Sequence, residues 1–190
     1  MKGIDVSYVQ GDNINWQQVK AAGYDFAICR SSYGKKHFDE TFARNVEQAH
    51  RAGLICGAYH YSYALNPDDA KQEAQYCKWL IENSGVLLEL PVFFDIEDGD
   101  GYKAYHDFNF SRRNVTDICR SFLDNIKPLN AGIYASYSWL DDLIDWRSLN
   151  CPVWNAQYYH TDFLKGFMWQ YTENLVIGGK RFDGNILYEV

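Results

Sequence analysis

Short apolar runs alternate with amphipathic helical patterns along the first two thirds of the chain. In Lys2–Val9 apolar residues alternate with polar ones, and Asp5 falls on the polar face, which predicts a half-buried strand. Later runs are rich in β-branched and aromatic residues, as buried strands are. We therefore expect further strands at Tyr24–Ser31, Leu54–Ala64, the first half of Pro91–Asp100, and Ala131–Ser136.

Helical spacing of apolar residues separates these runs. The clearest helix start is Asn66-Pro67-Asp68-Asp69, because it offers a capping side chain, a proline at the first helical position and acids in the first turn. We expect this helix to end near Asn83. The other expected helices run from Asn13 or Asn15 to Ala22, from Asp39 to Ala52, from Ser111 to Ile126 and from Ser138 to Asp145.

The pattern changes in the last third of the chain, where three short strands follow one another without clear helices. They are expected at Cys151–Tyr158, at Phe167–Thr172 and in a final run that ends at Ile186. Strands that feed crossover helices indicate a parallel sheet, and eight strands can close into a barrel. A complete eight-helix barrel needs about 250 residues. We therefore predict an α/β fold, a shortened TIM-like barrel of eight strands with about five helices. An open doubly wound sheet is the alternative, but the first turn lacks a GxGxxG motif.

Composition and net charge narrow the range of possible partners and functions. The length of 190 residues and the 47% content of hydrophobic residues fit one domain, 1–190. Aromatic residues are abundant at 17%, and tyrosine and tryptophan often line clefts that bind sugar rings. A net charge of −7 argues against a nucleic-acid partner or an anionic membrane surface. No apolar run is long enough to suggest membrane insertion.

The ends and the cysteines indicate the compartment less clearly. The chain begins with a strand pattern and shows no signal peptide, so either export is unconventional or a signal was removed. The five cysteines are widely spaced and odd in number, which favours neither a disulfide framework nor a zinc cluster. Cys29 and Cys56 lie in apolar runs and are expected to be buried free thiols.

Two carboxylic acids mark the run at Pro91–Asp100. Asp95 and Glu97 are separated by one residue, so in a strand they point to the same side with Cα atoms roughly 6.5–7 Å apart. Acids at the end of a buried strand must be paired, hydrated or shifted in pKa. They are either an acid/base pair in a cleft or two surface acids, and this run alone does not decide between these readings.

Two more acids belong to strands that would meet in a closed barrel. Asp5 lies in the first strand and Asp183 in the last, which become neighbours on closure. Reactive groups of such barrels collect at the carboxyl ends of the strands, so Asp5, Asp95, Glu97 and Asp183 are expected at one mouth. Taken alone, Asp5 or Asp183 reads as a turn or cap residue.

Aromatic residues are candidates for the wall of the same cleft. Tyr59, Tyr61 and Tyr63 share one face of a strand, for which core packing is the default and a cleft wall the alternative. His60 points away from them and is expected to be a satisfied buried histidine. Similar candidates on later strands are Tyr134, Trp154, Tyr158, Trp169 and Gln170.

Clustered carboxylates also suit a hard metal ion. However, the sequence contains neither a DxDxDG loop nor an HExxH motif, so a metal site ranks lower. We expect no metal and no cofactor.

An ordered set of motifs resembles the Chalaropsis-type lysozymes, glycoside hydrolase family 25. The matching segments, which span nearly the whole chain, are Gly3–Ser7, Gln10-Gly11, Trp16, Phe26–Gly34, Ala52–Tyr61, Phe94–Glu97, Gly132–Ser136, Trp169–Thr172 and Phe182–Asn185. The Gly-rich run usual before the last aspartate is altered here to Leu175–Lys180.

The resemblance implies a barrel of eight strands and about five helices, and N-acetylmuramidase activity on the β-1,4 bond between N-acetylmuramic acid and N-acetylglucosamine. By motif, Glu97 would be the general acid. Asp95 would orient the substrate's own acetamido group, and Asp5 and Asp183 would shape the field. The residues expected to bind the sugar are Tyr59, Tyr61, Tyr134, Trp154, Tyr158 and Gln170.

The expected partner is the peptidoglycan glycan strand, outside the cytoplasm, with the enzyme acting as a monomer. It would be a bacterial lysozyme or a phage-type lysin. Two other functions stay open at this point: a catalytically silent relative that binds cell-wall glycan, and a metal-dependent hydrolase that uses the same acids.

Overall fold

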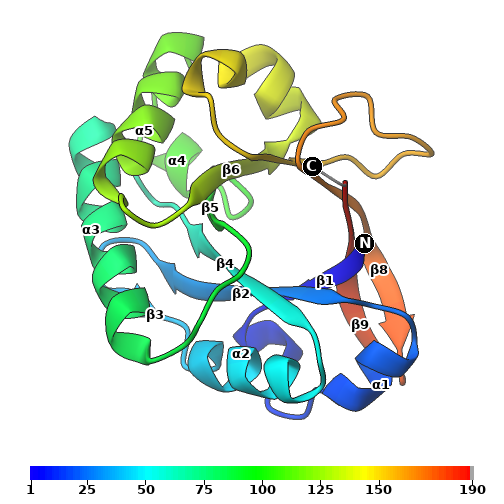
Figure 1. Ribbon diagram of the computed structural model, residues 1–190. Coiled ribbons are helices and arrows are strands. Elements are labelled where there is room, and N and C mark those ends of the chain that lie inside the picture. Colours follow the sequence, from blue (N-terminus) through cyan, green and yellow to red (C-terminus); the bar gives the residue numbers. More distant parts are fainter. Residues whose placement is uncertain (189–190) are drawn as a thin grey trace.

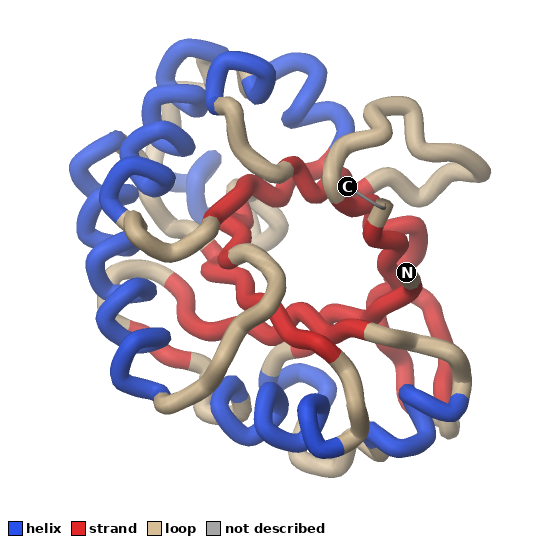
Figure 2. Tube along the Cα trace, viewed as in Figure 1, coloured by secondary structure: helices blue, strands red, loops and turns tan. Residues whose placement is uncertain are grey.

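Eight strands form a closed barrel in the computed structural model, which describes residues 1–188 (Figures 1 and 2). The pairing of the first strand with the second completes the ring. Around the barrel the strands are β1 (Lys2–Val6), β2 (Phe26–Tyr33), β4 (Ile55–Tyr61), β5 (Val92–Asp95), β6 (Ala131–Ser136), β7 (Val153–Ala156), β8 (Met168–Ile177) and β9 (Lys180–Leu187). The short β3 (His37–Phe38) pairs with the end of β2. The predicted shortened α/β barrel is therefore confirmed; residues 189 and 190 of the predicted domain lie outside the described residues.

One strand departs from the predicted parallel sheet. β9 runs antiparallel to both β8 and β1, whereas the other barrel neighbours are parallel. The reason is the turn before it: Ile177 pairs with Lys180, which leaves only Gly178 and Gly179 between the strands, both with positive φ. A two-residue connection makes a hairpin and cannot make a parallel crossover.

The helices lie around the outside of the barrel (Figure 1). Their bounds are α1 (Trp16–Ala21), α2 (Phe42–Arg51), α3 (Pro67–Ser84), α4 (Tyr102–Tyr105) and α5 (Arg112–Asn125). The helix expected near residues 138–145 is a single π-helical turn, Trp139–Leu143, and a 3₁₀ turn follows at Trp146–Leu149. The short α4 falls in a loop for which the sequence pattern predicted no helix.

The first strand is shorter than predicted. It ends at Val6, and a 3₁₀ turn, Tyr8–Gln10, replaces the expected continuation to Val9. Ser7 causes the change, because its hydroxyl accepts the Val9 N–H at 3.2 Å while the Gln10 side chain accepts the Ser7 N–H at 2.9 Å. This reciprocal cap at Ser7 ends the strand at Val6.

Alternating side chains divide β5 between two apolar clusters. Phe94 packs outward against Phe122 of α5, with ring centroids 4.2 Å apart. Phe93 points into the barrel, where it packs against Trp154 at 5.2 Å and closes the interior. Since strand neighbours alternate, Asp95 shares the interior face with Phe93. The barrel therefore has an apolar floor with carboxyl groups above it.

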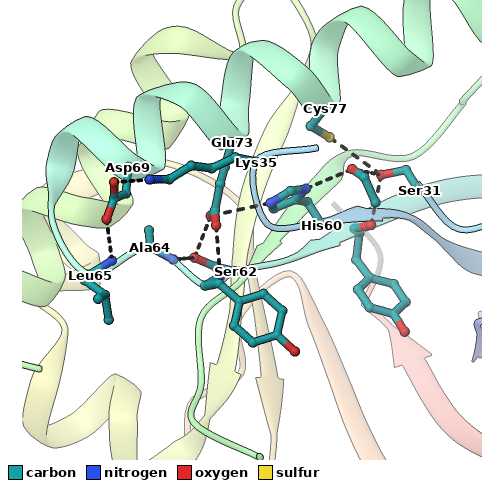
Figure 3. A network of polar contacts seen from close by, with 12 residues as sticks. Ser31, Lys35, His60, Ser62, Ala64, Leu65, Asp69, Glu73 and Cys77 are labelled. Carbon is teal, nitrogen blue, oxygen red and sulfur yellow. Dashed lines mark hydrogen bonds and ion pairs between the residues drawn. The ribbon is translucent and has the colours of Figure 1, made fainter. Parts of the chain in front are cut away.

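A polar network joins α3 to the barrel (Figure 3). His60 is fully buried between strand and helix, as predicted, with Nδ1 2.8 Å from the Ser32 hydroxyl and Nε2 3.4 Å from Glu73. Burial lowers the pKa of His60, but the neighbouring Cys77 thiol and Glu73 carboxylate raise it to about 9. The imidazolium therefore balances the buried Glu73 carboxylate at neutral pH.

Substitutions of Asn66 test whether the N-cap of α3 stabilises the protein. The Asn66 side chain accepts the Asp69 N–H at 3.0 Å, so Asn66→Ala should lower the free energy of unfolding by about 1 kcal/mol in urea titrations. Asn66→Ser keeps a capping oxygen and should stay near the wild-type value. Asn83→Ala, at an exposed site of the same helix, is the control. Equal losses for Asn66→Ala and Asn66→Ser would contradict the cap.

Candidate active site

Four carboxyl groups meet at the carboxyl end of the barrel. Asp5, Asp95, Glu97 and Asp183 line one cavity of about 240 Å³. The structure places five of the six predicted sugar-binding residues on the same cavity: Tyr59, Tyr61, Tyr134, Trp154 and Gln170. Tyr158 does not line it, but its hydroxyl donates to Gln170 Oε1 at 2.8 Å. Trp169, next to Gln170 on β8, is absent from the lining and uses its indole N–H on the Gln157 carbonyl.

Asp5 and Asp183 face each other across the β1–β9 pairing. Asp5 is buried, and its Oδ2 accepts hydrogen bonds from Gln170 Nε2 at 2.9 Å and Asn185 Nδ2 at 2.7 Å. The two carboxyl groups also hydrogen-bond each other. Burial raises the pKa of both, and burial together with the Asp5 charge raises the pKa of Asp183 to about 8. Asp183 therefore carries the shared proton at neutral pH.

The amide of Gln170 is held in one orientation. Its Oε1 accepts the hydroxyls of Tyr134 at 2.9 Å and Tyr158 at 2.8 Å, so its Nε2 faces Asp5. Trp154 fixes the Asn185 amide in the same way, by donating its indole N–H to Oδ1 at 2.9 Å. Both amides thus present N–H groups to the Asp5 carboxyl, which is charge-assisted hydrogen bonding. Trp154 is only 1% exposed, so it supports the floor of the cavity rather than offering an open face.

Asp95 and Glu97 occupy different depths. Asp95 ends β5, is 5% exposed, and its Oδ1 has no hydrogen-bond partner among the described residues. Burial, followed by the Glu97 charge, raises the pKa of Asp95. Glu97 lies two residues beyond the end of β5 and is partly exposed, yet it reaches the same cavity. An uncharged Asp95 or Glu97 lets the other ionise, because two close carboxylates in a buried site repel.

Glu97 holds its proton to a higher pH than an ordinary glutamate. Burial raises its pKa, the nearby ammonium of Lys103 lowers it, and the charges of Asp100 and Asp183 raise it further. Gly99 makes room for the carboxyl group, since a Cβ at this position would lie 3.2 Å from Glu97 Oε1. Glu97 is therefore the partly exposed acid of the cluster, with a pKa above that of an ordinary glutamate, and it faces the groove.

Two cations of the site were missed by sequence reasoning. Arg30 lines the cavity; its Nε donates to Asp39 at 2.9 Å, and its guanidinium lies over the rings of Tyr8 at 4.7 Å and Tyr33 at 5.3 Å. Lys103 is buried behind Glu97 in α4. Arg30 lies within the matched motif Phe26–Gly34 and was readable there, whereas Lys103 lies in a loop without periodicity. Asn185 was likewise visible only as part of the FDGN motif.

The acids lie in the middle of a longer groove. On one side a cavity of about 760 Å³ shares Asp5 and Asp183 and continues along the β8–β9 hairpin to Arg181. On the other side a cavity of about 420 Å³ shares Tyr61 and Glu97 and reaches Asp100. The loop after β5 thus contributes Gly99 and Asp100 to the wall of this cavity. The groove suits an extended polymer better than a small molecule.

Within residues 1–188, no group of three or more His, Cys, Asp or Glu side chains is arranged to hold a metal ion. Among the described helices, none has the length and apolar content needed to cross a membrane.

The proton shared by Asp183 should make stability depend on pH. The pKa of this group is about 8 when folded and 3.8 as an ordinary aspartate, so the folded protein binds more protons between these values, and stability falls as pH rises through this window. Asp183→Asn removes this loss. The free energy of unfolding of Asp183→Asn minus that of wild type should therefore be larger at pH 8 than at pH 5, by on the order of 1 kcal/mol or more.

Urea unfolding at both pH values measures this difference. The exposed Asp142→Asn serves as the control and should parallel wild type. A constant offset between Asp183→Asn and wild type at pH 5 and pH 8 would mean that Asp183 takes up no extra proton on folding.

Comparisons with known proteins identify the family. A family model described as "Glycosyl hydrolases family 25" matches residues 4–180. Lysozyme M1 of Streptomyces globisporus is 28% identical over 196 residues, which cover 96% of this chain and 65% of that protein. The autolytic lysozyme of Clostridium acetobutylicum is 28% identical over 160 residues, 83% of this chain and 45% of that protein.

A solved structure agrees with these matches. The crystal structure of the bacterial lysozyme from Streptomyces coelicolor has a TM-score of 0.77 and 26% identity, and the match covers 100% of this chain and 92% of that one. This chain spans 65% and 45% of the lengths of the Streptomyces globisporus and Clostridium proteins. The resemblance predicted from the ordered motifs is confirmed, and the chain belongs to glycosyl hydrolase family 25.

Proposed function

We propose that this chain is an N-acetylmuramidase, a lysozyme that hydrolyses the β-1,4 bond between N-acetylmuramic acid and N-acetylglucosamine in bacterial peptidoglycan. The observation that carries the proposal is the cluster of four acids in the middle of a long groove, in a chain of glycosyl hydrolase family 25. Tyrosine side chains along this groove offer amphipathic surfaces for sugar rings. The names of the two lysozyme relatives support the same substrate class.

Glu97 acts as the general acid. Its carboxyl group is partly exposed at the groove, and burial together with neighbouring acids raises its pKa. It protonates the glycosidic oxygen as the bond to the leaving sugar breaks, which prevents the build-up of an alkoxide. Because the proton is consumed in this step, activity falls as pH rises through the pKa of Glu97.

Asp95 acts on the substrate's acetamido group, which is the nucleophile of the reaction. From its buried position beside Glu97 it orients the substrate's acetamido group, whose carbonyl oxygen attacks the anomeric carbon in a retaining, substrate-assisted route. An inverting route, with a carboxylate-activated water, uses the same residues. In glycoside hydrolases that use two carboxyl groups directly, the distance between these groups predicts retention or inversion. The relation does not apply to substrate-assisted enzymes, so it does not choose between these routes.

The remaining site residues hold the reacting groups and the sugar. At the floor of the groove Asp5 supplies a negative charge and Asp183 holds a proton. Hydrogen bonds from Gln170 and Asn185 fix the Asp5 carboxyl group. Tyr59 and Tyr61 flank the sugar, and Tyr134, Trp154 and Tyr158 maintain the floor and rim. The enzyme acts as a monomer on the cell wall outside the cytoplasm, as a bacterial lysozyme or a phage-type lysin.

The central test is the removal of the acid. Glu97→Gln keeps the shape but has no proton to give, and clearing of a peptidoglycan suspension should slow by at least about 100-fold. Glu82→Gln, exposed on α3, should clear walls at the wild-type rate. Circular dichroism confirms that both variants are folded. Wild-type clearing by Glu97→Gln would exclude Glu97 as the acid.

Product analysis separates the other functions. Mass spectrometry of digested peptidoglycan should find muramic acid at the new reducing ends; glucosamine there would indicate a glucosaminidase. Wall binding by wild type without new reducing ends would indicate a silent glycan-binding relative. Activity that is lost in a chelator and restored by a divalent ion would indicate a metal-dependent hydrolase.

A further inference from the structure

Lys103 is the most deeply buried cation near the groove. It lies in the short helix α4 and is 1% exposed, although lysine is almost never fully buried unless it is paired. Within residues 1–188, no carboxylate lies within ion-pair distance of its ammonium group. The proposed reaction makes no direct use of it. Such a group is costly to bury, which calls for another explanation.

The ammonium group instead joins two strand ends. Lys103 Nζ donates to the Ser62 carbonyl at 2.5 Å and to the Glu97 carbonyl at 2.7 Å. Ser62 directly follows β4, and Glu97 follows the neighbouring β5. One side chain therefore connects the backbone of Glu97 to the adjacent strand, behind the groove.

A second attachment lies one residue after Glu97. The Asp98 carboxylate accepts the backbone N–H of Lys103 at 2.6 Å and that of Ala104 at 3.0 Å, which fixes α4 to the loop. Glu97 is thus bracketed by a contact to its own carbonyl and by a contact from the next residue. Both contacts come from α4, so this helix holds the backbone on both sides of the Glu97 side chain.

Acidic groups surround the ammonium from each packed element. They are Glu73 of α3, Asp95 of β5, and Glu97, Asp98 and Asp100 of the following loop, with the Cys119 thiol on α5. Glu73 is already satisfied by the Ser62 hydroxyl at 2.8 Å, the Tyr63 N–H at 2.9 Å and His60 (Figure 3). Glu73 is nonetheless the acid that most strongly favours the charged form of Lys103, followed by Asp95, and the ammonium in turn lowers the pKa of Asp95 and Glu97.

We propose that Lys103 is a positioning residue for Glu97: it ties the backbone of the general acid to the end of β4 and places one positive charge behind the carboxyl groups of the groove. This inference rests on the proposed function, because it concerns the residue assigned as the acid. Lys103 touches no substrate and acts only through Glu97 and Asp95.

Removal of the charge should move the pH profile in a defined direction. The Lys103 ammonium lowers the pKa of both Asp95 and Glu97. In Lys103→Met both carboxyl groups should hold their protons to higher pH, and the alkaline limb of the activity profile should shift upward by on the order of 1 pH unit. Loss of the tie should also lower kcat by roughly 10- to 100-fold, because misplacement of a catalytic group is costly.

The experiment compares three substitutions by clearing of peptidoglycan from pH 4 to pH 9. Lys103→Met removes charge and hydrogen bonds, whereas Lys103→Gln keeps N–H donors without charge and should show the pH shift with a smaller loss of kcat. Lys78→Met is the matched control, since Lys78 also donates to a backbone carbonyl, that of Lys127 at 2.7 Å, but on an exposed face. Its profile should equal that of wild type.

The outcomes separate this inference from the proposed function. An inactive wild type overturns the proposed function. If the wild type is active, two results overturn the role of Lys103 and leave Glu97 in place as the acid. In the first, Lys103→Met and Lys103→Gln lose activity equally at all pH values. In the second, neither variant folds. A shifted limb in both folded variants supports the inference.

Discussion

Mutual repulsion among buried carboxyl groups is the constraint on which the rest of this structure depends. Four acids share one cavity, and burial alone raises the pKa of each. Since close carboxylates in a low-dielectric site cannot all ionise, some of them must keep protons at neutral pH. The fold decides which ones do so by distributing amide donors and cations unevenly around the cluster.

The uneven distribution follows from the barrel. Asp5 receives two amide N–H groups and is thereby stabilised as the anion, while Asp183, directly opposite on β9, keeps the proton between them. On the other side of the cavity, Lys103 and the apolar floor act on Asp95 and Glu97. Each donor is itself fixed by a further hydrogen bond, as with the Tyr134 hydroxyl on Gln170. The floor of aromatic side chains keeps water from screening these interactions.

Much of this arrangement was predictable from the sequence. Strand patterns placed Asp5, Asp95 and Asp183 on strands, and closure of the barrel implied that they meet. The antiparallel course of β9 was missed, although Gly178-Gly179 signals a hairpin; this error did not displace Asp183, because it still pairs with Asp5 across the first and last strands. Periodicity works here because the interior of a barrel selects every second residue.

The positions that were not predicted lie where periodicity stops. Lys103 lies in the short helix α4, whose position depends on contacts with Ser62 and Asp98 that no apolar periodicity predicts. Burial of Trp154 was also not foreseen, since a strand residue that faces the interior can lie at the floor or at the rim. Depth along the barrel axis depends on the stagger of all eight strands, which no local pattern records.

Direct observation of the Glu97 proton tests the central claim most sharply. Carboxyl ¹³C shifts of the wild-type protein can be followed by NMR across pH, with the Glu97 signal assigned by its absence in Glu97→Gln. The account predicts a titration midpoint for Glu97 above the ordinary glutamate value of 4.5, because burial and neighbouring acids favour its protonated form. A midpoint at or below 4.5 would contradict it, since Glu97 would then be ionised when the glycosidic oxygen needs a proton.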